Sequence, residues 1–242
     1  MENDLNEAGV NSLKEKLLTN ALEIIPFDGW SKASFEAAIE KTNIDLETGY
    51  RIFPKGESDL ANYFHEFGDN KMLENLTKTD LSGLRYSEKI AEAVWIRVSA
   101  FEDYQVHQIV LKKALATFLL PVNLLPGTKL VWDTADKIWN FMGDTSDDYN
   151  WYTKRMILSG IISSTFLFFI GDKSEGFVDT REFINRRISD VMEFEKAKSQ
   201  AKSNPLFQPI FKTLERLPKR KSQSDLDLSK YPGWVPDEES KV

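Results

Sequence analysis

The apolar residues of this 242-residue chain recur at three- and four-residue steps almost from end to end. In the first such run they fall at Leu13, Leu17, Ala21 and Leu22, and similar steps continue through 90–101, 131–142 and 184–191. This spacing places apolar side chains on one face of a helix, whereas a half-buried strand would alternate apolar and polar residues. No segment alternates in that way and no internal repeat is found. The sequence therefore predicts an all-α protein.

The composition excludes most site chemistries. The chain has no Cys and 2 His residues, which removes disulfides, thiol catalysis and thiolate metal sites. His65 and His107 lie in different predicted helices without the spacing of a di-iron bundle, so we interpret each as an ordinary core or surface side chain. No phosphate-binding loop, dinucleotide motif or nucleophile elbow is found. We therefore expect no catalytic residue, no metal, no cofactor and no enzymatic activity.

The net charge of −7 is a sum of unlike parts. Residues 196–221 carry eight Lys and Arg side chains against one Glu, while residues 1–195 carry a net −11. Within this basic segment, 204–220 places its large apolar residues on one helical face, which is typical of a helix lying on anionic lipid. The alternative is that this helix docks on the protein body. The predicted membrane-binding residues are Leu206, Phe207, Ile210, Phe211, Lys212, Leu214, Arg216 and Leu217.

No targeting or membrane-spanning segment is expected. The first eleven residues are acidic and polar, unlike a signal or transit peptide. The most apolar stretch, 156–170, is fifteen residues long and is bounded by Arg155 and Asp172, so it is too short for a bilayer. A buried or cavity-lining helix is the better interpretation.

Three short predicted helices followed by Tyr50-Arg51-Ile52-Phe53-Pro54-Lys55-Gly56 resemble the helix-turn-helix of tetracycline-repressor-like regulators. The resemblance implies that the third helix enters the DNA major groove. Residues 31–53 nevertheless carry a net charge of −1, and Asp45 and Glu47 stand at the start of that third helix. Phosphate contacts need cations, so DNA binding is disfavoured. A ligand-sensing DNA-binding transcriptional regulator remains the alternative function.

A second resemblance covers about four fifths of the chain. It rests on 119–123, Asp136-Lys137-Ile138-Trp139, the block 143–155 (GDTSDDYNWYTKR), and 179–188. These residues are similar to the lipid-binding accessory protein family of ubiquinone (coenzyme Q) biosynthesis, the ninth named member of that pathway. The resemblance implies a repressor-like fold that binds no nucleic acid. It also implies an apolar cavity holding a quinone precursor or other isoprenoid or phospholipid, and docking of the demethoxyubiquinone hydroxylase at a membrane.

The resemblance and the apolar pattern together predict a lipid cavity between the apolar run 118–125 and the apolar stretch 156–170. The alternative is that these side chains simply pack together as a core. Gly160, Ser163 and Ser164 leave room for either a ligand or a neighbouring helix. The predicted lipid-binding residues are Phe118, Leu119, Leu120, Leu124, Met156, Ile157, Ile161, Phe166 and Phe169.

The block 143–155 also implies the surface that docks the hydroxylase. Trp, Tyr and Arg are enriched at the energetic centres of interfaces. The alternative is that Trp151 is a core aromatic at a helix start. The predicted docking residues are Ile138, Trp139, Met142, Asp148, Trp151, Tyr152 and Arg155.

The predicted organisation divides the chain into a flexible N-terminus (1–10), a helix-turn-helix-like unit with the following helix (11–76) and a lipid-binding and partner-docking domain (77–195). A basic linker (196–203), the amphipathic helix (204–220) and a disordered tail (221–242) follow. We expect a homodimer, because repressor-like folds usually pair through their last helices. It would be peripheral at the cytoplasmic face of a bacterial inner membrane, or at the matrix face in a mitochondrion.

Overall fold

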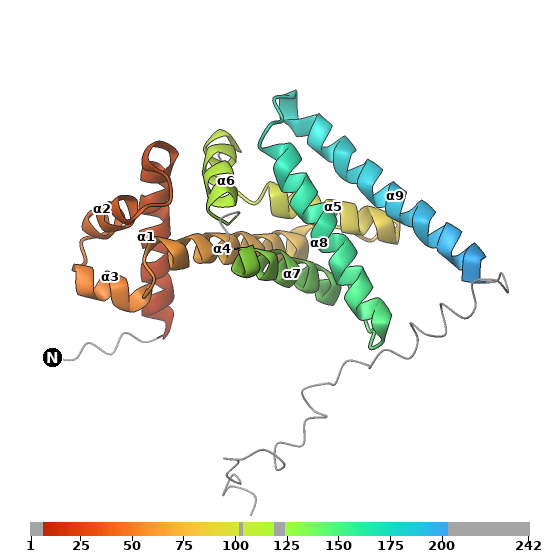
Figure 1. Cartoon of the computed structure of the whole chain (residues 1–242), viewed down its shortest axis with the longest axis horizontal. Helices are drawn as coiled ribbons and strands as arrows, with labels where there is room; N and C mark the ends of the chain where they lie inside the picture. Colours follow the sequence, from red (N-terminus) through yellow and green to blue (C-terminus); the bar gives the residue numbers. More distant parts are fainter. Residues whose placement is uncertain (1–6, 102–103, 119–123, 203–242) are drawn as a thin grey trace, which may run out of the picture.

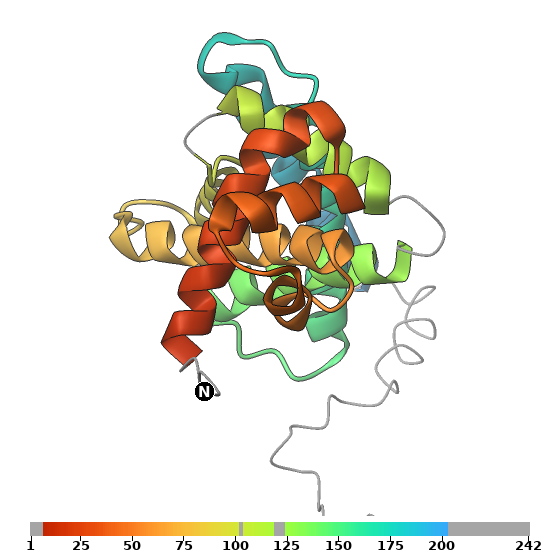
Figure 2. The ribbon, with the colours of Figure 1, turned by 90° about the vertical axis from the view of Figure 1, so that its left-hand side faces the viewer.

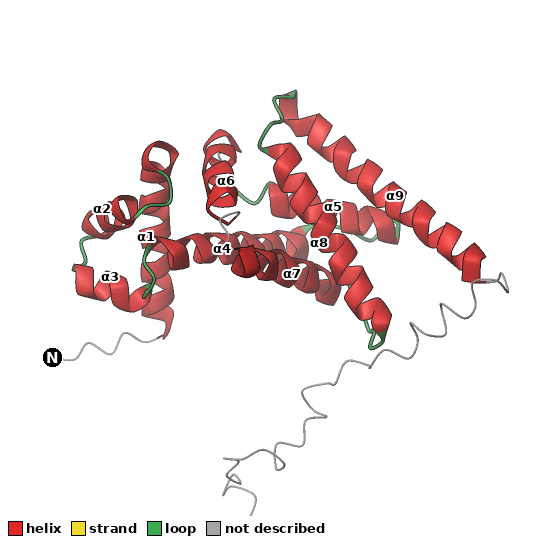
Figure 3. Ribbon diagram, viewed as in Figure 1, coloured by secondary structure: helices red, strands yellow, loops and turns green. Residues whose placement is uncertain are grey.

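The computed structural model describes residues 7–101, 104–118 and 124–202, and every regular element in those ranges is a helix (Figure 3). The all-α prediction is confirmed for this part of the chain. The helices are α1 (Glu7–Asp28), α2 (Lys32–Thr42), α3 (Leu46–Ile52), α4 (Glu57–Lys78), α5 (Tyr86–Val98), α6 (Tyr104–Phe118), α7 (Leu124–Phe141), α8 (Tyr149–Phe169) and α9 (Val178–Lys202), with a 3₁₀ turn at Glu175–Phe177 before α9.

Helix α4 joins two hydrophobic clusters. Its N-terminal half gives Leu60 and Phe64 to a cluster with α1, α2 and α6, and its C-terminal half gives Met72 and Leu76 to a cluster with α5, α7, α8 and α9. Figure 1 shows α4 running from the α1–α3 end of the molecule toward the α5–α9 end. Helix α6 packs against α1 and gives Val110 and Ala114 to the first cluster, while its Leu111 belongs to the second. Both clusters therefore contain side chains from the two predicted units 11–76 and 77–195, so the two units share one packed structure.

The predicted helix-turn-helix-like unit is built from α1 to α3. Ser31 caps α2, accepting a hydrogen bond from the Ser34 backbone amide, and Asp45 caps α3 in the same way. Tyr50 stacks edge-on to the Phe35 ring with centroids 5.1 Å apart, so α3 is held against α2 by aromatic packing. The three-helix prediction is confirmed.

One predicted boundary is wrong, and one sequence signal is overridden by the fold. A Pro-Gly pair usually interrupts a helix, but Pro126 and Gly127 both lie in the first turn of α7. The backbone N–H groups in the first turn of a helix have no hydrogen-bond acceptor within the helix, so a proline, which lacks an N–H, is tolerated there. The predicted linker 196–203 is helical as far as Lys202, where α9 ends. Residues 196–202 hold no Gly or Pro, and six of the seven are Lys, Ala or Gln, which favour a helix.

The start of α9 is capped from a distance. Asp179-Thr180-Arg181-Glu182 has the spacing of a capping box, but Asp172 performs the capping from the preceding turn. Its Oδ2 accepts hydrogen bonds from the Thr180 amide at 2.9 Å and from the Thr180 hydroxyl at 2.5 Å, and Thr180 is fully buried. The carboxylate reaches across eight residues because the 3₁₀ turn folds the chain back. Sequence spacing alone could not anticipate that contact.

Candidate functional site

The sequence block 143–155 forms the junction between α7 and α8. Helix α7 ends at Phe141, and Gly143 turns the chain with a φ of +75°, a conformation that favours glycine. Asp148 then caps α8, accepting from the Asn150 amide at 2.9 Å and from the Asn150 side-chain amide at 2.8 Å. Asp148 therefore binds both the backbone amide and the side-chain amide of Asn150, which fixes the residue at which α8 begins.

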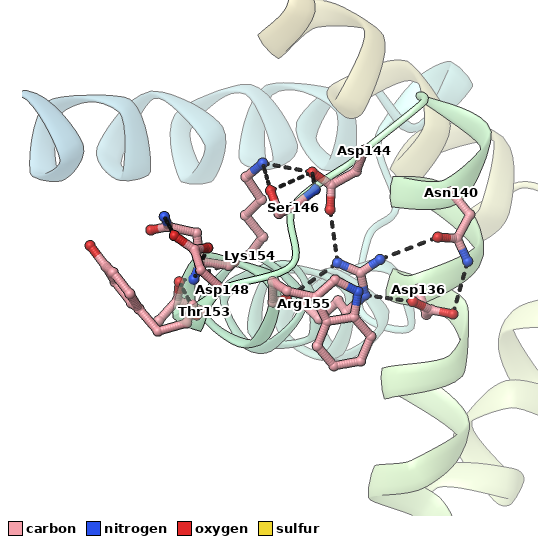
Figure 4. A network of polar contacts seen from close by, with 11 residues as sticks. Asp136, Asn140, Asp144, Ser146, Asp148, Thr153, Lys154 and Arg155 are labelled. Atoms are coloured by element: carbon pink, nitrogen blue, oxygen red, sulfur yellow. Dashed lines mark hydrogen bonds and ion pairs between the residues drawn. The ribbon is translucent and has the colours of Figure 1, made fainter. Parts of the chain in front are cut away.

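Arg155 lies at the centre of this junction (Figure 4). Its side chain is fully buried, and its guanidinium donates to Asp136 on α7, to Asp144 in the loop at 2.9 Å and to Asn140 on α7 at 3.2 Å. The guanidinium also stacks over the Trp151 ring, 4.1 Å from its centroid. One buried cation therefore links α7, the loop and α8.

Asp144 shares its two oxygens between two cations. Oδ2 accepts from Arg155, while Oδ1 accepts from Lys154 at 2.7 Å and from the Ser146 hydroxyl at 2.8 Å. Burial alone would raise the Asp144 pKa, but the hydrogen bonds from Lys154, Arg155 and Ser146 outweigh it and hold the pKa well below its usual value. Asp144 is therefore a structural anion with both oxygens engaged, and a poor proton donor or acceptor near neutral pH.

The structure corrects part of the docking prediction. The side chains of Ile138 and Arg155 are 0% exposed and that of Trp151 is 9% exposed, so these three cannot meet a partner directly. The alternative interpretation of Trp151 as a core aromatic is the right one. Trp139, Met142 and Asp148 are half-buried. Of the seven predicted docking residues, only Tyr152 is exposed, at 45%.

Tyr152 begins an exposed apolar stripe on α8, which we call the α8 stripe: Tyr152, Met156 and Leu167. Their separations of four and eleven residues place them on one helical face, with the exposed Gly160 between them. Met156 is 61% exposed and Leu167 56% exposed. The prediction that Met156 lines a lipid cavity is therefore wrong, because α8 is apolar on nearly all sides and this side faces outward.

The predicted lipid residues divide between two cavities. The first, which we call the inner cavity, has a volume of about 170 Å³ between α4, α6, α7 and α8, and includes Phe118 and Phe166. The second, the side cavity, has about 230 Å³ between α5, α8 and α9 and includes Ile157 and Ile161. Phe169 lines neither and is fully buried in the core. The sequence placed all of these side chains in one cavity because α8 presents apolar residues to both sides.

Other predicted residues fall outside the described structure. Leu119, Leu120 and the side chain of Leu124 do so, as does the whole predicted membrane helix 204–220 with its eight residues. The structure therefore leaves those predictions as they stood. Within the described ranges, no helix is both long and apolar enough to cross a bilayer, and His, Asp and Glu side chains form no group suited to a metal ion.

Several residues that shape the junction were not predicted as site residues. Asp136, Asp144 and Lys154 belong to the segments that carry the family resemblance and Asn140 lies beside them, but none of the four was assigned a role. The available signal was the order of charges, with acids in α7 and the loop and two adjacent cations one turn into α8. The convergence of Asp136, Asn140 and Asp144 on the Arg155 guanidinium required the α7–α8 packing.

Comparisons with known proteins agree with this architecture. A model of the COQ9 family matches residues 125–195, which contain the whole α7–α8 junction. Ubiquinone biosynthesis protein COQ9-B, mitochondrial, from Xenopus laevis is 32% identical over 195 residues, covering 79% of this chain and 66% of the relative. The mitochondrial COQ9 proteins of Rattus norvegicus and Homo sapiens are each 29% identical, again over 79% of this chain. The chain spans 62% and 61% of those two relatives.

Among solved structures, a TetR transcriptional regulator from Nitrosomonas europaea is similar with a TM-score of 0.60, covering 74% of this chain and 97% of that one. Its 18% sequence identity supports a common fold alone. The tetracycline-repressor-like fold predicted from the sequence is thereby confirmed. The match of the family model across the α7–α8 junction and the identity of about 30% to curated relatives show that the chain belongs to the COQ9 family of ubiquinone biosynthesis proteins.

Proposed function

We propose that this chain is a non-enzymatic, lipid-binding accessory protein of ubiquinone biosynthesis. It holds an isoprenoid quinone precursor, or another isoprenoid or phospholipid, and presents it to the demethoxyubiquinone hydroxylase. The names of the curated relatives support the pathway. The proposed setting is the surface of an anionic membrane, which the basic segment 196–221 contacts. The proposed oligomeric state is a homodimer.

One observation carries the proposal: the inner cavity and the α8 stripe meet at Leu167. This residue lines the cavity and is also 56% exposed, so the cavity reaches the surface beside the stripe. Thr128, an exposed residue near the start of α7, lines the same cavity from the other side. A partner that covers the α8 stripe therefore also covers an opening of the cavity.

The volume of the inner cavity limits how the lipid sits. Small-molecule sites usually enclose about 300–1000 Å³, and the 170 Å³ formed by the described residues is smaller. The cavity therefore takes only part of a lipid, and the remainder leaves along the surface near Leu167. Its walls are mostly apolar, with His65, Thr128 and Ser163 as polar exceptions. This arrangement suits a ligand that is handed over and not stored.

The Arg155 network supports the docking surface from beneath. Trp151 packs between the buried guanidinium and Tyr152, whose ring lies edge-on with centroids 4.8 Å apart. The exposed Tyr152 side chain is thus backed by a fixed aromatic ring. Pre-organised side chains lose less conformational freedom on binding, which favours affinity.

The lipid part of the proposal is tested by filling the inner cavity. Ser163 lines the cavity from α8, and in the Ser163→Phe variant the phenyl ring occupies much of its volume. We expect mass spectrometry of the natively purified protein to find a co-purified isoprenoid or phospholipid in wild type and several-fold less in the variant. The control is Gly160→Ala, whose added methyl meets no atom within 4 Å. Wild-type protein without lipid, or a variant with the full amount, contradicts the proposal.

The docking part is tested on the α8 stripe. We expect the double variant Tyr152→Ala/Met156→Ala to stay folded, since both side chains are exposed, and to lose hydroxylase in a pull-down. Leu46→Ala is the matched control, because Leu46 is 51% exposed on α3 at the other end of the molecule. Equal recovery of hydroxylase by the stripe variant and the control would rule out this surface.

The alternative function, a DNA-binding regulator, draws support from the fold alone. In α3, Glu47 lies in the first turn and Asp45 caps the helix, so two carboxylates stand where phosphates would approach. Arg51 is the one basic residue of this helix, and it lies in the last turn. We expect no duplex binding in a shift assay at low salt. Tight binding there would favour the regulator instead.

A further inference from the structure

A third and larger hollow lies away from the α8 stripe. We call it the α1–α4–α6 groove, and it has a volume of about 1180 Å³. Leu18 and Leu22 line it from α1, Phe67 from α4, Phe101 from the turn after α5, and Val110 from α6. Figure 2 looks onto the end of the molecule where α1 crosses in front of α4. The groove shares only Phe64 with the lining of the inner cavity, so that side chain separates the two.

His107 lines this groove and is unusual because its ring is buried without hydrogen bonds to the part of the chain that the structure describes. The residue is 3% exposed, and neither Nδ1 nor Nε2 has a hydrogen-bond partner among the described residues. Its ring is surrounded by aromatic rings, with centroids 4.5 Å from Phe101, 5.6 Å from Phe169 and 6.1 Å from Phe64. Leaving a buried polar group unpaired is costly, and native proteins rarely do so without a reason.

The other histidine, His65, is also buried but has hydrogen-bond partners for its ring. Its Nε2 lies 2.8 Å from the Thr134 hydroxyl and 3.2 Å from the Leu130 carbonyl. Both imidazoles are uncharged at neutral pH. Burial, and then the nearby Arg97 guanidinium, lower the pKa of His107 to about 3. A neutral imidazole has one donor and one acceptor, so His107 offers a matching pair to a ligand.

The charged side chains at the rim are already paired. Glu74 accepts from Lys78 at 2.7 Å and from Lys71 at 3.4 Å, and Glu23 pairs with Lys41. These exposed pairs contribute little stability, but they cancel the rim charge that would otherwise select an ion. The rest of the wall is largely aromatic and aliphatic. The groove therefore favours an uncharged, largely apolar molecule.

We propose that the α1–α4–α6 groove binds a neutral aromatic molecule carrying a hydroxyl or carbonyl group, and that this group hydrogen-bonds to the His107 imidazole. The ligand ring packs among Phe64, Phe67 and Phe101, where offset or edge-on contacts between rings are favourable. The volume exceeds that of a single ring, so an apolar substituent extends along α1 past Leu22. This site is separate from the proposed lipid cavity and docking surface.

The test uses two probes of similar shape, 1-naphthol and 1-methylnaphthalene, of which only the first has a hydroxyl. The full chain contains two histidines, so a ¹⁵N-labelled imidazole spectrum resolves the groove from the inner cavity. We expect 1-naphthol to shift the ¹⁵N signals of His107 and to bind about three- to tenfold more tightly than 1-methylnaphthalene, as a single neutral hydrogen bond allows. In His107→Phe, that preference should disappear while 1-methylnaphthalene binds as before.

The wild-type spectrum keeps the test decisive if His107→Phe does not fold. Three results would overturn the proposal: unmoved His107 signals, equal affinities for the two probes, or a high-resolution structure in which water alone satisfies His107 with no probe in the groove. Shifts confined to His65 would place the probe in the inner cavity. That outcome refutes the groove site and leaves the lipid proposal standing.

Discussion

Replacing Arg155 with methionine tests whether the buried network organises the α7–α8 junction. Methionine keeps much of the aliphatic length but removes the charge from a site with no exposed side-chain surface. Breaking a buried ion pair from one side usually costs about 3–5 kcal/mol, because the abandoned carboxylates stay buried. Here Asp144 keeps Lys154, and Asp136 is 30% exposed and can reach water. The expected loss is therefore near the lower end, about 3 kcal/mol.

Urea unfolding followed by circular dichroism measures this loss. With a urea m-value of about 2 kcal/mol/M, the transition midpoint should fall by about 1.5 M. The matched control is Arg186→Met on α9, where Arg186 is 55% exposed and lies 3.6 Å from Glu182. That exposed pair should contribute less than about 0.5 kcal/mol. If the two variants differ by less than about 1 kcal/mol, the junction does not depend on Arg155 and the reasoning fails.

Further predictions concern pH and close packing. The folded pKa of His65 and that of His107 are about 3, against about 6.5 when unfolded, so the unfolded chain takes up the protons. Stability should be constant above about pH 6.5 and fall by about 1.4 kcal/mol per pH unit per histidine below it; a free energy of unfolding that is unchanged between pH 7.5 and 5.5 would refute this. A Cβ at Gly68 would lie 2.7 Å from the buried Arg97 guanidinium, so Gly68→Ala should cost about 1–3 kcal/mol in urea unfolding. Gly160→Ala, in open space on α8, should instead stabilise by up to about 1 kcal/mol, and equal effects at the two sites would contradict the packing argument.

The inner cavity, the side cavity and the α8 stripe all arise from the composition of α8. This helix is apolar on almost every side, with Phe166 in the inner cavity, Ile161 in the side cavity and Leu167 at the surface. A helix that only filled a core would turn polar residues outward. The exposed apolar side is thus a feature of the sequence that folding leaves unused, and the proposed hydroxylase docking gives it a role.

The sequence by itself determined the helical class, the caps of α2 and α3 and the acidic character of α3. Each of these depends on contacts within a few residues: Ser31 with Ser34, Asp45 with Thr48, and apolar side chains one turn apart. The block 143–155 also marked the α7–α8 junction, since it contains the cap Asp148 and the exposed Tyr152. Local chemistry of this kind is written directly in residue order.

Only the tertiary structure decided which side of each helix is covered. Arg155 and Tyr152 are both typical interface residues, yet the first is buried beneath α7 and the second faces outward. Met156 points away from the cavity that its apolar character suggested, and Asp172 caps α9 across a turn. An apolar periodicity shows that a face exists, but what covers it depends on the packing of helices distant in sequence. For the same reason the unpaired nitrogens of His107 became visible only in the folded chain.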